Sequence, residues 1–362
     1  MLFLLAFLFS SCDEKKTSRE QNSDKKVTVD TKPEPDEDSV YAVTMVGDIM
    51  LGTNYPSSYS LPPDDGEYLL DDVKEFLEAS DVTIGNLEGT LLNKGGTPKK
   101  CRDSSSNCVS FRMPEHYAEY LKDAGFDIMS VANNHSGDMG DIGRKSTMNT
   151  LEEYKLKFAG YSSCPTTVYV KDGIKFGFTA FAPNTGTQSL LDITSAEKTV
   201  KELKGKCDIL IVYFHGGAEG SGATRVPRKT EYYLGEDRGD IYEFAHAMVD
   251  AGADIVFGSG PHVPRGIELY NEKIIAYSLG NFCTYGKFGL SGALGYAPIL
   301  KVYIDKDGNF LQGRIFPAIQ IKRGIPVIDE NYKAVDFIRS LSEKHFPESE
   351  LEFNDDGKIA KK

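Results

Sequence analysis

Short apolar runs alternate with amphipathic stretches along most of the chain. The runs are rich in β-branched or aromatic residues and end near Gly, Asn, Asp or His, which is typical of buried β-strands. They predict strands at Tyr41–Val46, Val82–Gly85, Ile128–Ala132, Lys175–Ala182, Asp208–Phe214, Ile255–Gly258 and Ile274–Leu279. Apolar residues at three- and four-residue spacing predict helices at Asp71–Ala79, Glu115–Ala124, Lys145–Glu153, Ser195–Lys204 and Asp240–Ala251.

This alternation indicates a layered α/β sandwich, with mixed β-sheets flanked by helices. The stretch Ala297–Ile321 is expected to form an antiparallel hairpin, because Asp305–Gly308 has the composition of a turn. One amphipathic helix is expected at Lys333–Glu343, and a tail rich in charged residues is expected after it. We therefore predict one domain over residues 40–325, followed by a helix and a charged tail over residues 326–362.

Five short strings place polar residues just after predicted strands. They are GDIMLG (Gly47–Gly52), GNLEG (Gly85–Gly89), ANNHSGD (Ala132–Asp138), YFHGGAE (Tyr213–Glu219) and GSGPHV (Gly258–Val263). Because a parallel sheet presents the ends of its strands to one shared crevice, these strings can converge although they are far apart in the sequence. A single site is the simplest explanation.

The composition supports a substantial core and argues against nucleic acid as a partner. The chain has 362 residues, of which 40% are hydrophobic. Lys and Arg total 41 against 54 Asp and Glu, which gives a net charge of −13, and no basic stripe is evident. Since an acidic surface repels polyanions, a phosphorylated or polycarboxylate substrate would need a local cation, which a bound metal would supply.

The first twelve residues, MLFLLAFLFSSC, are too short to cross a bilayer as a helix but fit the apolar region of a secretory signal. The sequence around Ser10-Ser11-Cys12 resembles the lipobox of bacterial lipoproteins, in which the signal is removed and Cys12 becomes lipidated. The alternative, a frayed apolar tail, would expose contiguous hydrophobic surface. Residues 13–39 contain almost no large apolar residue, so we expect a disordered tether between membrane and domain.

Cys101 and Cys108 flank a polar loop, and six residues separate them. This spacing allows a disulfide, which we favour over two free thiols in an oxidising compartment. Zinc binding is less favoured, because no second close Cys pair exists. Cys164, Cys207 and Cys283 are expected to be small core residues rather than ligands.

Six ordered strings, GDIMLG, NLEG, ANNH, HGGAE, GSGPHV and AYSLGNF, resemble the signature of the CapA family, the poly-γ-glutamate capsule synthesis proteins. The resemblance covers Tyr41–Phe316. It implies a calcineurin-like metallophosphatase fold and a membrane-anchored location on the outer side of the cytoplasmic membrane. It also implies a role in the assembly or anchoring of capsular polyglutamate. The predicted lipid anchor is consistent with that location.

The first two strings leave alternatives open. Asp48 can bind a metal or cap a following helix. The resemblance favours the ligand, because related phosphatases begin their metal site with an Asp at this strand end, although Met50 stands where they place a His. Asn86 and Glu88 point to the same side of an extended segment, so both can face one cation, with Glu88 as the bridging carboxylate. An Asn turn followed by a surface Glu is the alternative.

Asn133-Asn134-His135 gives the sharpest local signal. An amide oxygen can bind a metal while an adjacent imidazole transfers a proton. The resemblance implies that Asn134 is a metal ligand and His135 a general acid. Asp138 can orient the imidazole, and we include it with His135 in the catalytic pair. A structural His near a helix start is the alternative.

The last two strings carry His215 and His262, both expected as metal ligands. Glu219 is expected as a ligand, a partner behind the ligands or a substrate contact. Related proteins usually carry another His two residues before His262, where this chain has Gly260. We therefore expect one metal ion, or a second ion held by water and other residues, and we expect a His restored at position 260 to raise metal occupancy.

Two further polar residues follow these strings. Arg265 can clamp an anionic group of a substrate through its planar guanidinium, and solvation at the surface is the alternative. Asn281, in the string SLGNF, is expected to bond backbone or ligand beneath the site rather than react.

Two classes of function fit these residues. One is a metal-dependent hydrolase or transferase acting on a phosphoester, amide or peptide-like bond in the cell envelope, with one or two Mn, Fe or Zn ions. The other is a non-catalytic polymer-binding or anchoring scaffold that has lost full metal coordination. An envelope polymer or a small anionic substrate is the expected partner, with other capsule-synthesis membrane proteins nearby. No G-x-S-x-G or P-loop string is present.

Overall fold

The computed structural model describes residues 27–29, 40–99 and 109–362. Cys12, Cys101, Cys108 and most of the predicted tether lie outside these residues, so the lipid anchor, the disulfide and the tether stay predictions. None of the helices in the described ranges is long and apolar enough to cross a membrane.

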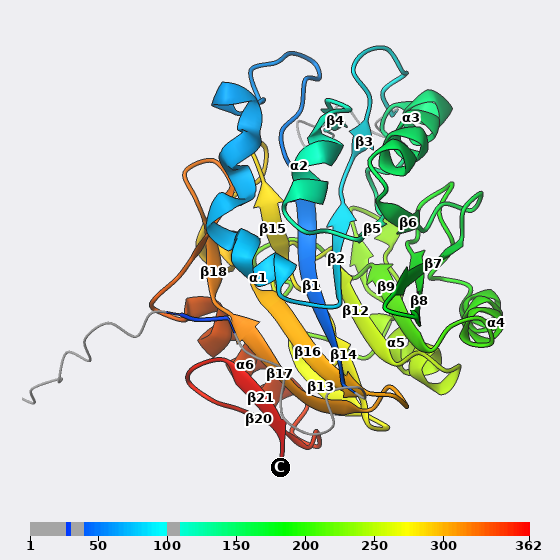
Figure 1. Ribbon diagram of the computed structural model, residues 1–362, viewed down its shortest axis with the longest axis vertical. Coiled ribbons are helices and arrows are strands. Elements are labelled where there is room, and N and C mark those ends of the chain that lie inside the picture. Colours follow the sequence, from blue (N-terminus) through cyan, green and yellow to red (C-terminus); the bar gives the residue numbers. More distant parts are fainter. Residues whose placement is uncertain (1–26, 30–39, 100–108) are drawn as a thin grey trace, which may run out of the picture.

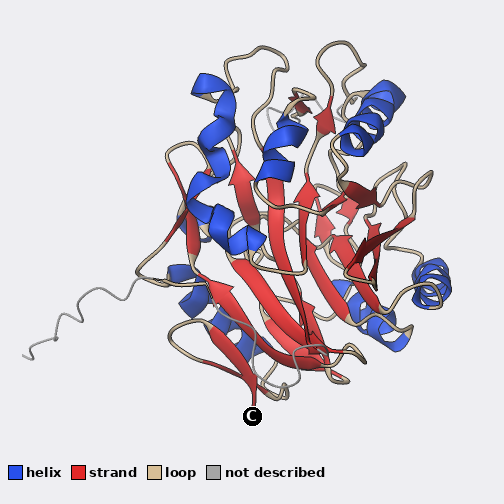
Figure 2. Ribbon diagram, in the orientation of Figure 1, coloured by secondary structure: helices blue, strands red, loops and turns tan. Residues whose placement is uncertain are grey.

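Two large β-sheets form the centre of the protein (Figure 1, Figure 2). Within the described residues the larger sheet has nine strands. In order across the sheet they are β20 (Leu351–Phe353), β21 (Lys358–Lys361), β17 (Phe310–Phe316), β16 (Ile299–Asp305), β1 (Val40–Met50), β2 (Val82–Leu87), β5 (Ile128–Ser130) and β6 (Lys157–Ala159), with β15 (Asn281–Thr284) paired to β1. The neighbours β1, β2, β5 and β6 run parallel, whereas β16, β17, β20 and β21 pair antiparallel, so the sheet is mixed.

The smaller sheet is also mixed. Its strands, in order, are β13 (Ile267–Tyr270), β14 (Lys273–Ala276), β12 (Ile255–Ser259), β9 (Ile209–His215), β8 (Ile174–Phe181) and β7 (Thr166–Lys171). Short pairs lie outside the two sheets: β3 (Thr90–Leu91) with β4 (Arg112–Met113), β10 (Tyr232–Tyr233) with β11 (Glu236–Asp237), and β18 (Ala318–Ile321) with β19 (Ile325–Ile328).

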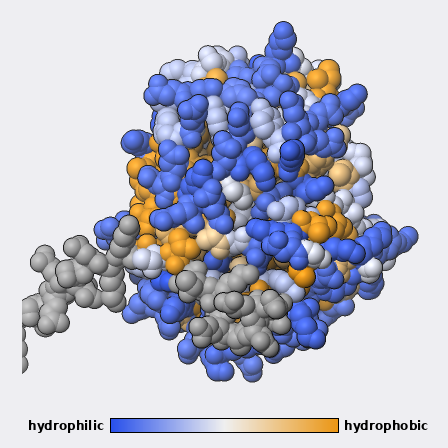
Figure 3. All heavy atoms as spheres, in the orientation of Figure 1, coloured by the Kyte–Doolittle hydropathy of each residue, from blue (hydrophilic) through white to orange (hydrophobic). Residues whose placement is uncertain are grey.

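Helices flank the sheets on their outer sides (Figure 2). Beside the larger sheet lie η2 (Pro63–Val73), α1 (Lys74–Glu78), α2 (Tyr117–Asp123) and α3 (Gly140–Glu153). Beside the smaller sheet lie α4 (Ile193–Lys204) and α5 (Ile241–Asp250). The remaining helices of the described chain are η3 (Gly292–Gly295) and α6 (Lys333–His345). The longer helices pack an apolar stripe against the sheets, as the helical spacing of apolar residues in the sequence predicts. Figure 3 shows that the outward faces on this side of the molecule are mostly hydrophilic.

Apolar side chains from both sheets meet in a shared central core. Val43 and Met45 of β1 pack in the same cluster as Phe178 of β8 and Ile211 of β9, and all four are fully buried. Burying each such side chain contributes about 1.5–3 kcal/mol relative to exposing it. The predicted layered α/β sandwich with mixed sheets is confirmed.

The predicted charged tail is wrong beyond α6. Residues 351–361 form the antiparallel pair β20 and β21, and β21 joins the edge of the larger sheet at β17. Leu351 and Ile359 are buried, whereas Glu352 and Lys358 are exposed. Successive residues of a strand face opposite sides, so the charged residues occupy the outward positions of an edge hairpin. The predicted helix at Lys333–Glu343 and the predicted hairpin turn at Asp305–Gly308 are confirmed.

Candidate metal centre

Strand register brings the predicted site residues together from both sheets. In the larger sheet, Asp48 of β1 is paired with Asn86 of β2 on one side and Asn281 of β15 on the other. In the smaller sheet, His215 of β9 is paired with Ser259 of β12, and the Ser259 hydroxyl donates to a carboxylate oxygen of Asp48. The expected convergence is therefore present. The expectation that one parallel sheet produces it is wrong, because two sheets contribute.

Asp48 lies inside β1, which continues to Met50, so the alternative that it caps a helix is excluded. Its position depends on Gly47: a Cβ there would lie 1.9 Å from the Gly280 carbonyl oxygen, the same oxygen to which the Asp48 N–H donates at 2.9 Å. Burial opposes ionisation of this carboxyl, but the hydrogen bond from His262 and the positive charge of that ring lower its pKa. Asp48 is thus held as a carboxylate.

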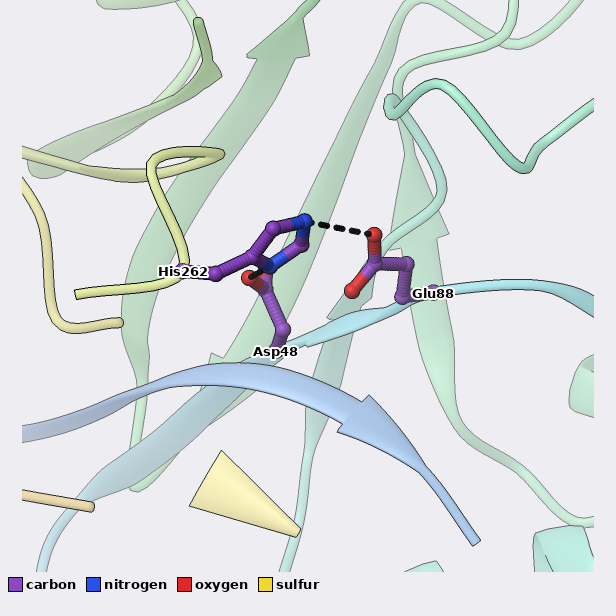
Figure 4. Close-up of side chains that lie close together, drawn as sticks. All are labelled: Asp48, Glu88 and His262. Atoms are coloured by element: carbon purple, nitrogen blue, oxygen red, sulfur yellow. Dashed lines mark hydrogen bonds and ion pairs between the residues drawn. The ribbon is translucent and has the colours of Figure 1, made fainter. Parts of the chain in front are cut away.

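Asp48, Glu88 and His262 form the centre of the cluster, with one potential ligand atom from each within 4.8 Å of the others (Figure 4). His262 Nδ1 is 3.1 Å from Asp48 Oδ2, and His262 Nε2 is 3.9 Å from Glu88 Oε1. Although burial lowers it, the carboxylates of Glu88 and Asp48 raise the pKa of His262 to about 10. Two carboxylates therefore draw positive charge to this point, which a proton or a metal ion can supply.

Glu88 is fully buried, which excludes the alternative of a surface Glu. Neither of its carboxylate oxygens has a hydrogen-bond partner among the described residues. Burial and the nearby Asp48 carboxylate raise its pKa well above the ordinary value. A buried carboxylate without partners is costly, and coordination of a cation is the usual way to offset that cost.

Two other predicted ligands also carry unpartnered atoms. Within the described chain, Asn134 Oδ1 and His215 Nε2 are buried without a hydrogen-bond partner. His215 Nδ1 lies 3.2 Å from the Tyr213 hydroxyl and 3.3 Å from Ser259 Oγ, so this nitrogen is already in contact with protein groups. Burial lowers the pKa of His215 well below its ordinary value, which keeps the ring neutral and able to bind a metal.

These donors fit a divalent ion. Asp48, Glu88 and His262 would hold it, and Asn134 and His215 offer further ligand atoms without protein partners in the described chain. The separation of 3.9 Å between His262 Nε2 and Glu88 Oε1 is compatible with two ligands each about 2 Å from one ion. Imidazole, carboxylate and amide oxygen together suit Mn, Fe or Zn.

His135 lies beside this cluster and is oriented as expected. Its Nδ1 is 2.7 Å from Asp138 Oδ2, and its Nε2 is 3.9 Å from Glu88 Oε1. Phe111 stacks on the ring, with centroids 4.1 Å apart. The ammonium of Lys99 is 3.1 Å from His135 Nδ1 and 3.0 Å from Asp138 Oδ1. Because Nδ1 donates its hydrogen to Asp138, the ring accepts nothing from Lys99, whose ammonium is ion-paired with the Asp138 carboxylate. The lone pair of the neutral ring is therefore on Nε2.

Asn86 and Asn281 hydrogen-bond to other residues of the site. Asn86 Nδ2 donates to Asp48 Oδ1 at 2.8 Å, and Asn86 Oδ1 accepts from Asn133 Nδ2 at 3.0 Å. Both ends of this amide are therefore bonded to protein, and the residue predicted as a ligand instead links Asp48 to the Asn133 turn. Asn281 Oδ1 lies 3.0 Å from His262 Nδ1, and its Nδ2 donates to the Leu294 carbonyl at 3.2 Å. Asn281 thus bonds backbone and a candidate ligand, as predicted.

Glu219 lies on the open side of the cluster, 13% exposed. Its Oε1 accepts from Arg238 Nη1 at 2.7 Å and from Asn134 Nδ2 at 3.4 Å. Its Oε2 is 3.8 Å from His262 Nε2. Glu219 therefore contacts Asn134 and His262, and Arg238 holds it there.

Arg265 is neither a substrate clamp nor a solvated surface residue. It is fully buried, and its Nη1 and Nη2 donate to Glu231 at 2.7 and 2.9 Å. It also donates to the carbonyls of Ala218 and Ala223 at 3.4 and 2.7 Å. Surface solvation is excluded, and the fork that would clamp a substrate is already bonded to Glu231. Arg265 instead holds the segment 218–231 that carries Glu219.

Sequence reasoning missed three polar residues of the site. Ser259, which donates to Asp48, lies within the GSGPHV string, so its place after a strand was available as a signal. Lys99 and Arg238 lie in no recognisable string. Arg238 is 1% exposed, and a buried Arg is visible only once the fold is known.

Met50 and Gly260, which stand where related proteins have His, are both built into the fold. Met50 is fully buried in the core between the larger sheet and its helices. Gly260 has φ +118°, and a Cβ there would lie 2.8 Å from both the backbone N and O of Gly216. A His restored at position 260 would have to push the two strand ends apart, so the gain in metal occupancy expected from the sequence stays a prediction that this contact opposes.

We predict that Gly260→Ala lowers the free energy of unfolding by about 2–4 kcal/mol, because it combines an unfavourable φ with overpacking against backbone. Gly220→Ala is the matched control, since Gly220 has φ +108° and open space within 4 Å of the position that a Cβ would occupy. That control should cost only the backbone strain, about 1 kcal/mol. Denaturant unfolding of the three proteins measures both, and equal losses would contradict the close contact with Gly216.

The comparisons with known proteins agree on one family. The family model described as bacterial capsule synthesis protein PGA_cap matches residues 42–285. The chain is 30% identical over 265 residues to the capsule biosynthesis protein CapA of Bacillus anthracis, covering 68% of this chain and 60% of that protein. It is 30% identical over 261 residues to the PGA biosynthesis protein CapA of Bacillus subtilis, covering 68% and 63%. The chain thus spans less than two thirds of the length of these relatives.

Similar solved structures are more distant. A 5'-nucleotidase precursor from Thermus thermophilus aligns with a TM-score of 0.41 and 13% identity over 84% of this chain and 59% of that chain. A purple acid phosphatase from yellow lupin seeds aligns with a TM-score of 0.37 and 10% identity over 84% and 56%.

Proposed function

This chain belongs to the bacterial capsule synthesis protein PGA_cap family, and we propose that it is a metal-dependent hydrolase or transferase acting on an envelope polymer or phosphoester. The observation that carries the proposal is the set of buried ligand atoms without partners in the described chain: both oxygens of Glu88, Asn134 Oδ1 and His215 Nε2. A protein that only bound a polymer would have no reason to keep such atoms buried together.

The residues around the centre have complementary chemical roles in this proposal. A bound divalent ion would polarise a substrate oxygen and lower the pKa of a coordinated water. His135 would move a proton at Nε2, with Asp138 fixing the ring through Nδ1. Burial lowers the pKa of His135, although Asp138 opposes this, so the ring rests neutral. His135 must then accept a proton before it can act as the general acid that the sequence predicts.

A non-catalytic scaffold is the second candidate, and Met50 and Gly260 favour it. Each replaces an imidazole that related proteins use. Met50 is packed in the apolar core, and a Cβ at position 260 would lie against the Gly216 backbone. A centre with fewer imidazoles binds metal more weakly. In this case the fold would present a polymer-binding surface without turnover.

We further propose a place in the cell envelope for this protein, supported by the capsule biosynthesis proteins to which it is similar. Anchoring through a lipid on Cys12, an acidic envelope polymer or small anion as substrate, and capsule-synthesis membrane proteins as neighbours belong to the same proposal. Labelling of the full chain with a radioactive fatty acid, lost in Cys12→Ser, tests the anchor.

Elemental analysis of protein purified without added metal tests the proposed function. At least one Mn, Fe or Zn per chain, together with turnover of p-nitrophenyl phosphate or bis(p-nitrophenyl) phosphate, supports the proposal that the protein is an enzyme. Binding of polyglutamate without stoichiometric metal and without turnover of either ester supports the scaffold. A protein that retains no metal and gains none on dialysis against Mn²⁺ would overturn the metal centre itself.

A further inference from the structure

A second charged site lies apart from the metal centre, between the segment after Glu219 and the end of α6. A surface pocket of about 360 Å³ opens there. Its polar lining consists of Arg225, Arg228, Lys344, His345 and Glu348. The pocket thus gathers three permanent cations and one acid on a protein whose net charge is −13, and none of its lining residues belongs to the metal centre.

One of the cations is fixed in place by protein groups. Arg228 pairs with Glu348, donates to the His345 carbonyl at 3.2 Å and lies over the ring of Tyr242, 4.6 Å from its centroid. Its charge is therefore balanced by Glu348, and its guanidinium is held against an aromatic face, where such contacts are favourable. Arg228 forms the rigid wall of the pocket.

The other two cations are unpaired. Arg225 and Lys344 are exposed, and neither side chain has a hydrogen bond or an ion pair with any residue of the described chain. His345 Nδ1 is also buried without a hydrogen-bond partner there. The unpaired charges are positive, so the pocket would attract an anion although the protein as a whole repels one.

The end of α6 explains only part of this arrangement. Lys344 and His345 lie in the last turn of the helix, where positive charge is favourable next to the free carbonyl groups. Arg225 belongs to a different segment and gains nothing from that helix end. The helix also offers no hydrogen-bond partner for His345 Nδ1.

We infer that this pocket binds an anionic ligand through carboxylate or phosphate oxygens, with Arg225 and Lys344 as its charged contacts and Arg228 as its fixed wall. The pocket stands independently of the metal centre. Only the choice of a glutamate chain as one probe rests on the proposed function. Inorganic phosphate is the second probe, because it presents anionic oxygens without a polymer.

The pocket also has a physical connection to the metal centre. Residues 218–231 carry Glu219 at one point and Arg225 and Arg228 further along, and buried Arg265 bonds this segment at Ala218, Ala223 and Glu231. A chain-like anion held at Arg225 would therefore lie on the same braced segment that presents Glu219 to the cluster.

The test is isothermal titration of the full chain, stripped of metal with EDTA, using tetraglutamate in one arm and inorganic phosphate in the other. Arg225→Ala/Lys344→Ala is expected to weaken binding of whichever anion binds by at least about tenfold, since each lost contact is charge-assisted. Raising the salt concentration should weaken wild-type binding, because exposed charges are screened. Tetraglutamate binding more tightly than phosphate identifies a polycarboxylate, and the reverse order identifies a phosphate.

The matched control is Lys145→Ala/Lys306→Ala, which removes the same charge from exposed positions outside the pocket and outside the segment 218–231. It should leave the affinity within about twofold of wild type, because distant surface charges are screened. No binding of either anion, or equal weakening in both double variants, would overturn the pocket. The titration uses metal-free protein, so its result can be interpreted even if the proposed metal centre is wrong. In a separate measurement on protein that has not been stripped, Arg225→Ala/Lys344→Ala should have the same metal content as wild type.

Discussion

Replacing Glu88 with Gln is expected to abolish retention of divalent metal, from at least one ion per chain to less than about a tenth of that value. Glu88 belongs to the group with Asp48 and His262, and its two oxygens have no hydrogen-bond partner in the described chain. Gln has nearly the same shape but no charge, so it removes the electrostatic attraction without opening a cavity. Elemental analysis after gel filtration measures the loss.

The same variant should change stability in opposite directions with and without metal. In metal-free protein, burial and Asp48 penalise the charged form of Glu88 and raise its pKa. A carboxyl whose pKa is raised by folding destabilises the fold above its ordinary pKa, so Glu88→Gln should unfold at the same temperature as wild type or higher at neutral pH. With Mn²⁺ at one hundred times its Kd, wild type should gain about 2.7 kcal/mol, and the variant should gain nothing.

Glu153→Gln is the control for this experiment, because Glu153 is an exposed carboxylate at the end of α3. It removes the same charge and should keep wild-type metal content and the stability gain with Mn²⁺. Full metal content in Glu88→Gln would show that Glu88 does not face the ion, and it would remove the main support for the metal centre.

The sequence predicted the central elements of the fold because their periodicities are strong. Buried strands such as β9 read as continuous apolar runs, and α4 and α5 show clear helical spacing. It did not predict β20 and β21, because an edge hairpin with alternating charged residues looks like a solvated tail. It also placed one helix at Asp71–Ala79, where η2 is followed by the short helix α1.

The candidate site was predictable wherever a polar residue follows a strand, and Asp48, Glu88, His135 and His262 indeed converge. What the sequence could not show is how the polar groups divide their bonds. Asn86 bonds protein at both ends of its amide, and Arg265 is buried against Glu231. These outcomes depend on which atoms lie within about 3 Å after folding, and no spacing in the sequence encodes that distance.

Replacing His135 with Ala is expected to lower turnover of p-nitrophenyl phosphate or its diester by a factor of about 10²–10⁴ while leaving metal content unchanged. This is the range that a positioned proton carrier contributes. His135 Nε2 faces Glu88 Oε1 at 3.9 Å, and its Nδ1 is bound to Asp138, so the ring lies beside the ligand set without completing it. Loss of activity with retained metal therefore separates proton transfer from metal binding.

The control is His116→Ala, which removes a half-exposed His that pairs with Asp65 rather than with any residue of the cluster. It should keep both turnover and metal content. His135→Gln adds a second arm, because it retains a polar side chain in contact range of Asp138 but cannot carry a proton at neutral pH. If His135→Gln and His135→Ala both turn over at the wild-type rate, His135 is a structural residue of the turn after β5, and the proton must come from elsewhere. If both lose turnover and metal together, the ring stabilises the metal centre rather than serving the chemistry, because a proton carrier can be removed without releasing the ion.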